Sequence, residues 1–251
     1  MNTITEHKYV DNRSGEYVYK GLSVHAGVGV HETVLDYLNY HFSKGVNVLV
    51  LGAGTGAFDC RLFDNGFTNI TSLDINADNY HYDNDAISFV AADLNESFAD
   101  KVAGKFDVVI AIEIIEHLYS TPHFLSNCHD ILNDDGALLI STPNPRSYAS
   151  RWKFLFTGFH NGFQGVPVLY EHINPIHMDI FRHHCFFQGF TIKHYTSFNH
   201  KYPITPIKRA LRYVLANLLG LSDRLTKNSH LLKEGKAISF YDLRVSKKGQ
   251  G

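Results

Sequence analysis

The sequence predicts an α/β protein in which helices cover both faces of a mainly parallel β-sheet. Apolar runs typical of buried strands recur between residues 46 and 141, and segments compatible with helices or loops separate them. The 251 residues suffice for one large α/β domain but not for two typical domains and a linker. No repeat and no Pro- or Ser-rich linker interrupts the chain. We therefore expect a single domain over residues 1–251.

Five apolar runs predict the first strands of this sheet. The first run lies between Gly45 and Gly52, and a helical stretch follows it to about Asn65. Because helical or loop segments separate the runs, neighbouring strands are expected to be parallel. The five runs are 46–51, 70–73, 86–91, 106–112 and 137–141.

The pattern changes after residue 142. A segment rich in aromatic residues and proline, 143–175, is predicted to be irregular, and loops of that length usually bind a ligand or close over one. It is expected to be a substrate loop. A helix at 176–188, a strand at 190–198 and a last strand at 237–246 follow. The remaining segments are an N-terminal helical cap (1–45) and a helical insertion (203–235).

Composition limits the class of protein. Apolar residues make up 44% and charged residues 19% of the chain, which is typical of a soluble globular protein and excludes disorder and a coiled coil. The net charge of -2 gives no support to non-specific nucleic-acid binding. Three widely spaced cysteines indicate neither disulfides nor a thiolate zinc site, and no apolar run is long enough to span a bilayer. A cytoplasmic location is expected.

A glycine-rich loop follows the first predicted strand. In Gly52-Ala53-Gly54-Thr55-Gly56, small residues let a ligand approach the backbone, and the next helix offers free N–H groups. Gly52, Gly54 and Ala57 also satisfy the dinucleotide-binding pattern, so the loop alone does not choose the cofactor. The alternative is a plain tight turn. Asp74, at the end of the second strand, does not choose the cofactor either, because its carboxylate can accept hydrogen bonds from the ribose hydroxyls of any nucleoside cofactor.

A second polar group follows the fourth strand. Glu113, Glu116 and His117 are predicted to open a helix, where their spacing puts them on one face. Two carboxylates and an imidazole can bind a divalent cation such as Mg²⁺, Mn²⁺ or Zn²⁺. His172 is the best candidate for a fourth ligand, and His177 is held in reserve. Of 16 histidines, these three are the ones expected at the sheet edge.

Four motifs together resemble the class I S-adenosylmethionine-dependent methyltransferases. They are VLVLGAGTGAF (48–58), LDI (73–75), ADL (92–94) and FDVVIAIEIIEHL (106–118). The resemblance extends over residues 46–198 and implies a Rossmann-like sheet of seven strands in the order 3-2-1-4-5-7-6, with the last strand antiparallel. The cofactor-binding residues that it implies are Gly52, Ala53, Gly54, Gly56, Asp74, Ile75, Asp93, Leu94 and Glu113. Asp93 would hold the adenine; otherwise it is the N-cap of a helix over residues 95–102.

The Glu-Ile-Ile-Glu-His-Leu segment narrows the resemblance. It is similar to ubiquinone-biosynthesis O-methyltransferases and to small-RNA 2'-O-methyltransferases, in which such a set and a later histidine hold a metal that chelates vicinal hydroxyls. The resemblance implies the ligands Glu113, Glu116, His117 and His172, and catalytic roles for the last three. The same string occurs in methyltransferases without a metal. There Glu113 would lie near the methionine amino group, and His117 would act as a general base.

The expected function is S-adenosylmethionine-dependent O-methylation of a small hydroxylated acceptor, either a phenol or quinone precursor or a sugar. Aromatic residues in 143–175 would wall its pocket, or would close the core under the loop. The alternatives are an RNA 2'-O-methyltransferase, an NAD-type Rossmann oxidoreductase and a catalytically silent cofactor-binding fold. A basic amphipathic segment, 207–221, predicts either peripheral membrane contact or ordinary core packing.

Overall fold

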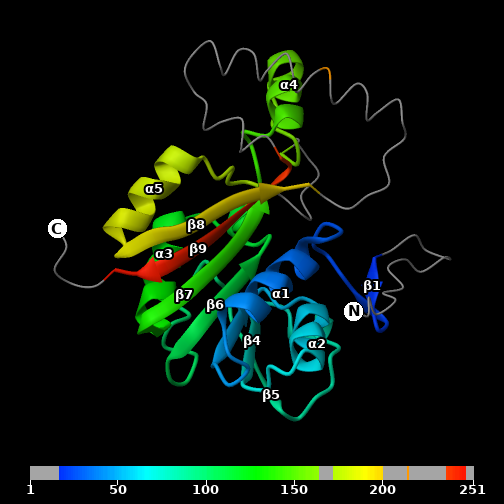
Figure 1. The fold of residues 1–251 in the computed structure, drawn as a ribbon, viewed down its shortest axis with the longest axis vertical. Coiled ribbons are helices and arrows are strands. Elements are labelled where there is room, and N and C mark those ends of the chain that lie inside the picture. The colour runs from blue at the N-terminus through cyan, green and yellow to red at the C-terminus, as the bar shows by residue number, and fades with distance from the viewer. Residues whose placement is uncertain (1–16, 164–171, 200–213, 215–235, 247–251) are drawn as a thin grey trace.

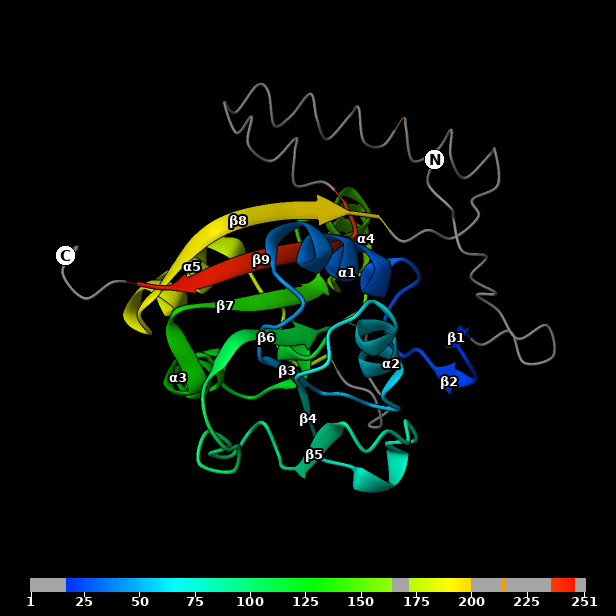
Figure 2. The ribbon, with the colours of Figure 1, turned by 60° about the horizontal axis from the view of Figure 1, so that its bottom comes forward.

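A computed structural model describes residues 17–163, 172–199, 214 and 236–246. Its centre is a seven-stranded sheet with the order β5-β4-β3-β6-β7-β9-β8, shown from two sides in Figures 1 and 2. Strands β3 to β7 are parallel, whereas β9 runs antiparallel between β7 and β8. Counted within this sheet in chain order, the strands follow 3-2-1-4-5-7-6. The predicted fold class and strand order are confirmed.

Most of the predicted strands agree with the observed ones to within about two residues, but the strand predicted at 137–141 runs from Leu132 to Pro143. The strands are β1 (Val18–Tyr19), β2 (Leu22–Ser23), β3 (Val48–Leu51), β4 (Ile70–Asp74), β5 (Ile87–Ala91), β6 (Phe106–Ile112), β7 (Leu132–Pro143), β8 (Phe190–Phe198) and β9 (Ile238–Val245). The α-helices are α1 (Val30–His41), α2 (Ala57–Asp64), α3 (Thr121–Ile131), α4 (Tyr148–Thr157) and α5 (Met178–Phe187), and two 3₁₀ turns are η1 (Ala77–Asn79) and η2 (Ile115–His117). Within the described part of the chain, no helix combines the length and the apolar character needed to cross a bilayer.

The three segments expected outside the sheet, 1–45, 143–175 and 203–235, match their predicted structures only in part. The described part of residues 1–45 contains the β1–β2 hairpin as well as α1, so it is not purely helical. The prediction that 143–175 is irregular is wrong for residues 148–157, where α4 forms with Ser147 as its N-cap and Gly158 as its left-handed C-cap. The 203–235 insertion and its amphipathic stretch 207–221 lie outside the described residues, apart from Val214.

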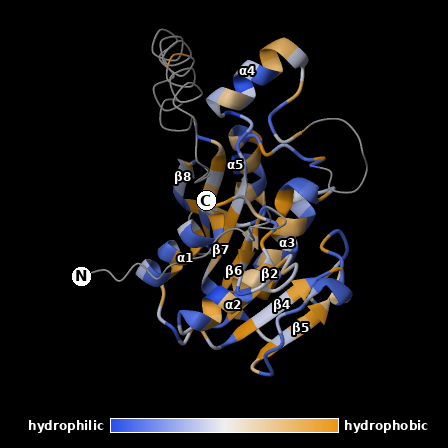
Figure 3. Cartoon of the chain, turned by 90° about the vertical axis from the view of Figure 1, so that its right-hand side faces the viewer, coloured by the Kyte–Doolittle hydropathy of each residue, from blue (hydrophilic) through white to orange (hydrophobic). Residues whose placement is uncertain are grey.

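The apolar runs are continuous because both faces of the central strands are buried. Along β3, Val48 and Val50 face α1 and α2, whereas Leu49 and Leu51 face α3 and α5, as the two-residue period of a strand requires. Every residue of β3 is buried. Figure 3 shows the result, with hydrophobic strands in the interior and helices that carry both hydrophobic and hydrophilic residues.

A buried charged cluster joins the N-terminal residues to α1 and α2. Arg61 is only 1% exposed, and its Nη1 lies 3.0 Å from Glu32 Oε1. Its Nη2 donates to the Tyr17 hydroxyl at 3.1 Å, and that hydroxyl donates to Glu32 at 2.6 Å. The guanidinium also stacks over the Tyr19 ring at 4.0 Å. Arg61 therefore connects three segments that are distant in sequence.

We expect Arg61→Leu to lower the free energy of unfolding by about 3–5 kcal/mol, because it leaves the Glu32 carboxylate without its buried cation. Lys20→Ala is the matched control. The Lys20–Asp64 pair is as short, at 2.7 Å, but lies at the surface, so its loss costs about 0–1 kcal/mol. Urea unfolding of both variants measures the difference, and equal losses would contradict the assigned role of Arg61.

Candidate functional site

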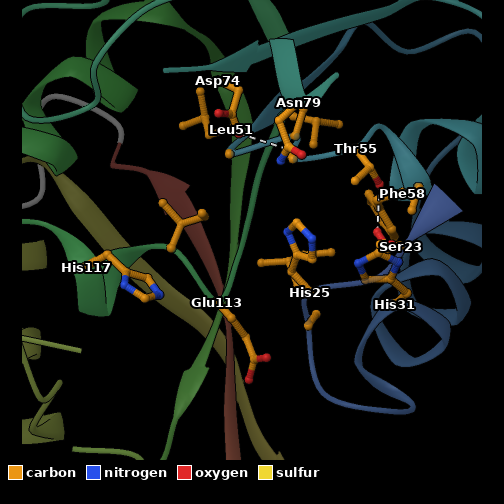
Figure 4. A pocket seen from close by; sticks show the side chains of 18 of the residues that line it. Ser23, His25, His31, Leu51, Thr55, Phe58, Asp74, Asn79, Glu113 and His117 are labelled. Atoms are coloured by element: carbon orange, nitrogen blue, oxygen red, sulfur yellow. Dashed lines mark hydrogen bonds between the residues drawn. The ribbon is translucent and has the colours of Figure 1, made fainter. Parts of the chain in front are cut away.

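The carboxyl ends of β3, β4 and β6 border a cavity of about 500 Å³. Parallel strands bring their carboxyl ends to one edge, which is where open α/β sheets bind ligands. Four parts of the chain form the wall: the glycine loop after β3, the end of β4 with Asn79, residues between 23 and 31, and the turn after β6 (Figure 4). His172 completes the lining. The size suits a small organic cofactor.

The glycine loop has the conformation that its sequence predicts. Gly52 and Gly56 have φ values of 69° and 82°, in the left-handed region. Neighbouring side chains also exclude a Cβ atom. On Gly52 it would lie 2.1 Å from Ile114 Cδ1, and on Gly56 it would lie 2.5 Å from Tyr82 Cβ. Glycine is therefore required at both positions for backbone geometry and for packing.

Asp74 closes the loop from the end of β4. Its Oδ2 accepts the Gly54 amide at 2.8 Å, and its Oδ1 accepts the Asn76 amide at 2.9 Å. A carboxylate has about four acceptor sites, so Asp74 can still accept hydroxyl groups from a ligand in the cavity that it lines. Asn79, which sequence reasoning missed, lines the same wall, whereas Ile75 is exposed and lies outside it.

Asp93 and Leu94 do not line this cavity. Asp93 Oδ1 accepts the Asn95 amide at 2.8 Å and its side-chain amide at 3.2 Å, so Asp93 stabilises a local turn. The alternative prediction of a helix over 95–102 is wrong, because the chain there forms turns. Leu94 is buried in the core.

Glu113 begins the turn after β6. It adopts a φ of 52°, although it is not glycine. Its Oε2 accepts the Gly27 amide at 2.8 Å. Burial raises the pKa of the Glu113 carboxyl, and the Gly27 N–H opposes that shift. The expected helical face is wrong: Glu113 precedes the 3₁₀ turn η2, so it does not share a helix with Glu116 and His117.

Three of the four predicted ligands come together. Among the described residues, Glu116, His117 and His172 each offer a ligand atom, and these atoms lie within 4.8 Å of one another. The two imidazole rings meet edge to face, with centroids 4.6 Å apart. Glu113 lies outside this group, and so does His177, whose ring instead lies 5.4 Å from that of His160.

The Glu116 backbone and side chain both hold the cluster in place. Its carbonyl oxygen accepts the amides of Ile173 and Asn174 at 3.0 and 2.9 Å, which fixes the chain next to His172. Its Oε2 accepts the Thr142 hydroxyl at 3.0 Å. Glu116 is fully buried, and its Oε1 has no hydrogen-bond partner within the described ranges. Such an oxygen is costly unless a cation or a proton compensates it.

Burial shifts the pKa values of two side chains in this cluster, Glu116 and His172. Burial, together with the nearby Glu113 charge, raises the pKa of Glu116 well above its usual value. Burial also lowers the pKa of His172 to about 4, with His117 adding to the effect, so His172 is neutral at pH 7. Neutral imidazole is the form that binds metals. One carboxylate oxygen and two imidazole nitrogens fit Zn²⁺, Mn²⁺ or Fe²⁺.

Sequence reasoning missed the N-terminal side of the cavity. Ser23, His25 and His31 line it, together with Ala26. The contact between Gly27 and Glu113 spans 86 residues, and no local spacing points to it. The signal in this segment is its two glycines, Gly27 and Gly29, ahead of a helix that begins with Val30 and His31.

Comparisons with known proteins agree with this geometry. Residues 29–197 match a family model described as a methyltransferase domain. The ubiquinone biosynthesis O-methyltransferase of Rickettsia akari (strain Hartford) is 32% identical over 120 residues, which cover 45% of this chain and 46% of that relative. The chain thus matches about half the length of this curated relative.

Two solved structures show the same fold. The S-adenosylmethionine-dependent methyltransferase from Mesorhizobium loti aligns with a TM-score of 0.54 and 16% identity, over 86% of this chain and 98% of that chain. The second is the magnesium protoporphyrin IX methyltransferase from Synechocystis PCC 6803 with bound SAH (S-adenosylhomocysteine). It aligns with a TM-score of 0.54 and 14% identity, over 86% of this chain and 80% of that chain. At such low identity these likenesses concern the fold alone.

The buried His31 predicts a pH-dependent stability. Burial lowers the pKa of His31 to about 3, and the Arg61 charge adds to this. The unfolded chain takes up this proton near pH 6.5, so stability is lost as the pH falls from 6.5 towards 3 and has fallen by about 2 kcal/mol at pH 5. His31→Phe should remove this loss of stability, because phenylalanine takes up no proton and its ring can still pack against Phe58.

Urea unfolding of the wild type and of His31→Phe at pH 8 and pH 5 measures the effect. His183→Phe, at an exposed position on α5, is the control and should keep the wild-type dependence. An equally large loss of stability at pH 5 in His31→Phe and in the wild type would contradict the assignment to His31.

Proposed function

Because the chain belongs to the methyltransferase family whose domain model matches residues 29–197, we propose that it transfers the methyl group of S-adenosylmethionine to a hydroxyl oxygen of a small acceptor. One observation carries this proposal. A single cavity has the glycine loop and Asp74 on one wall and His117 and His172 on another. A cofactor site and a group of side chains able to act on a hydroxyl therefore share one space.

The cofactor would lie against residues 52–55 and Asp74. Close approach to the backbone is possible at the glycines, and Asp74 keeps acceptor capacity for ribose hydroxyls. S-adenosylmethionine supplies an electrophilic methyl group on its sulfonium. NAD would use similar features, but the family match favours S-adenosylmethionine.

We propose that Glu116, His117 and His172 hold a divalent cation. The buried Glu116 Oε1, which has no partner in the described part of the chain, supports this, and so does the neutral state of His172. A cation bound there lowers the pKa of a coordinated hydroxyl. A histidine whose pKa is about 4 is a weak base at neutral pH, which favours a ligand role for His172 over a proton-accepting role.

The acceptor that fits best is a ring bearing a hydroxyl group. Phe163 packs against His172, with ring centroids 5.3 Å apart, and so offers an aromatic surface beside the cluster. The other aromatic residues in 143–175 give less support, since Phe154, Phe156 and Phe159 are exposed. The name of the Rickettsia akari relative favours a phenolic quinone precursor over a sugar. The net charge of -2 disfavours RNA.

Isothermal titration tests the cofactor. We expect S-adenosylmethionine to bind and NADH to give no heat. Asp74→Asn should weaken S-adenosylmethionine binding about tenfold or more, because the charged acceptor for the ribose is lost. Asp78→Asn, on the exposed turn η1, is the matched control. Tight NADH binding without S-adenosylmethionine binding would overturn the cofactor assignment.

Cation binding is tested on EDTA-treated protein without cofactor or acceptor, with Mn²⁺ as the probe and electron paramagnetic resonance as the readout. Glu116→Ala and His172→Ala should each weaken Mn²⁺ binding at least tenfold, because each removes a ligand atom. His183→Ala should bind like the wild type. If the wild type binds neither Mn²⁺ nor Zn²⁺, the cation proposal fails, and His117 as a general base becomes the better account.

A further inference from the structure

Glu113 occupies a backbone conformation that costs energy. Among the described residues, only Lys20 and Glu113 combine a side chain with a positive φ. Lys20 lies in the exposed β1–β2 turn, whereas Glu113 lines the cavity. A glycine would adopt a φ of 52° without strain, so the Glu113 side chain must compensate for its conformation.

The Glu113 side chain points to the N-terminal segment rather than to the histidines. Its Oε2 accepts the Gly27 amide at 2.8 Å, and it lies outside the group formed by Glu116, His117 and His172. In Figure 4 its carboxylate points away from His117. The hydrogen bond joins the end of β6 to a residue 86 positions earlier in the chain.

Residues 23–27, here called the strap, form one wall of the cavity. Ser23, His25 and Ala26 all line it. The His25 ring reaches the glycine loop: a Cβ atom added to Gly54 would lie 3.5 Å from His25 Nδ1. The strap therefore lies against the loop that the proposed cofactor would contact.

Two hydrogen bonds fasten the strap to the cavity, one at each end. At its start, Thr55 Oγ1 donates to the Ser23 carbonyl at 2.7 Å. At its end, Glu113 accepts the Gly27 amide. The hairpin before the strap is itself attached to α2, since the Tyr19 hydroxyl donates to Asp64 at 2.6 Å. Movement of the strap away from the cavity thus requires the Thr55 or Glu113 bond to break.

We propose that Glu113 is a positioning residue that fastens the strap over the bound cofactor and slows its release, and that it is not a metal ligand. This inference rests on the proposed function, because it takes the cavity to hold S-adenosylmethionine. It leaves Glu116, His117 and His172 as the protein ligands of the cation. It also gives the strain at Glu113 a function, since the hydrogen bond with the Gly27 amide compensates for the positive φ.

Hydrogen exchange of the cofactor-free protein tests the fastening directly. Glu113→Ala and Glu113→Gly should both speed exchange in peptides covering residues 17–29, because neither can accept the Gly27 amide. Glu113→Gln keeps an acceptor oxygen and should retain most of the protection. Thr55→Val removes the other bond and should act like Glu113→Ala. If Glu113→Gly exchanges like the wild type, Glu113 does not hold the strap and the inference is wrong.

Stopped-flow measurement of S-adenosylhomocysteine release tests the consequence. Release should be about ten- to a hundredfold faster in Glu113→Ala and Glu113→Gly, and near the wild-type rate in Glu113→Gln. Mn²⁺ affinity should stay near that of the wild type in Glu113→Gly, which adopts the same φ without strain. An unchanged release rate, or a loss of Mn²⁺ binding as large as in Glu116→Ala, would overturn the inference. If the wild type does not bind S-adenosylhomocysteine at all, the proposed function fails, while the exchange result still decides whether Glu113 fastens the strap.

Discussion

The left-handed turn at Glu113 is the constraint on which the site depends. Strand β6 pairs with β3 on one side and β7 on the other, so its end cannot shift, and the Glu113 amide still donates to the Ser141 carbonyl at 2.9 Å. From this fixed point the chain reverses its direction. Glu113 reaches Gly27, Ile114 lies against Gly52, and η2 carries Glu116 beneath Thr142. An extended conformation at Glu113 would disturb all three contacts at once, so the glycine-loop wall of the cavity and the histidine cluster both depend on the backbone of one residue.

The carboxylates on the two sides of the cavity differ in how their oxygen atoms are hydrogen-bonded. On the side of the glycine loop, Asp74 accepts two backbone amides. On the other side Glu116 is buried with one oxygen lacking a partner in the described structure, next to two imidazoles. A buried carboxylate of this kind lowers stability unless it is neutralised. The cation proposed above would neutralise it, and so would a proton on Glu116 in the absence of a cation.

Patterns among neighbouring residues predicted those features of the fold and the site that local backbone structure determines. The strands, the glycine loop and Asp74 follow from periodicity and from a turn that only glycine allows, so they could be read from sequence. The helical face of Glu113, Glu116 and His117 could not, because spacing alone does not distinguish an α-helix from a strand end followed by a 3₁₀ turn. The strap was missed for another reason: its attachment to Glu113 is set by the strand order of the sheet and has no trace in neighbouring residues. Similarly, Asp93 follows a strand as expected, but its carboxylate is directed into a local turn.

The burial of the histidines that line the cavity, more than the number of histidines in the chain, determines their charge at pH 7. Among the histidines in the described ranges, four line the cavity: His25, His31, His117 and His172. Burial lowers the pKa of His31 to about 3 and that of His172 to about 4, so both are neutral at pH 7. The proposed cofactor carries a positive charge on its sulfonium, and a protonated imidazole on either wall would repel it. Neutral imidazoles can instead contact the cofactor or bind a cation without adding positive charge, while the carboxylate of Asp74 contributes a negative one. With both imidazoles neutral, neither His31 nor His172 adds a positive charge that would oppose the proposed cofactor or the proposed cation.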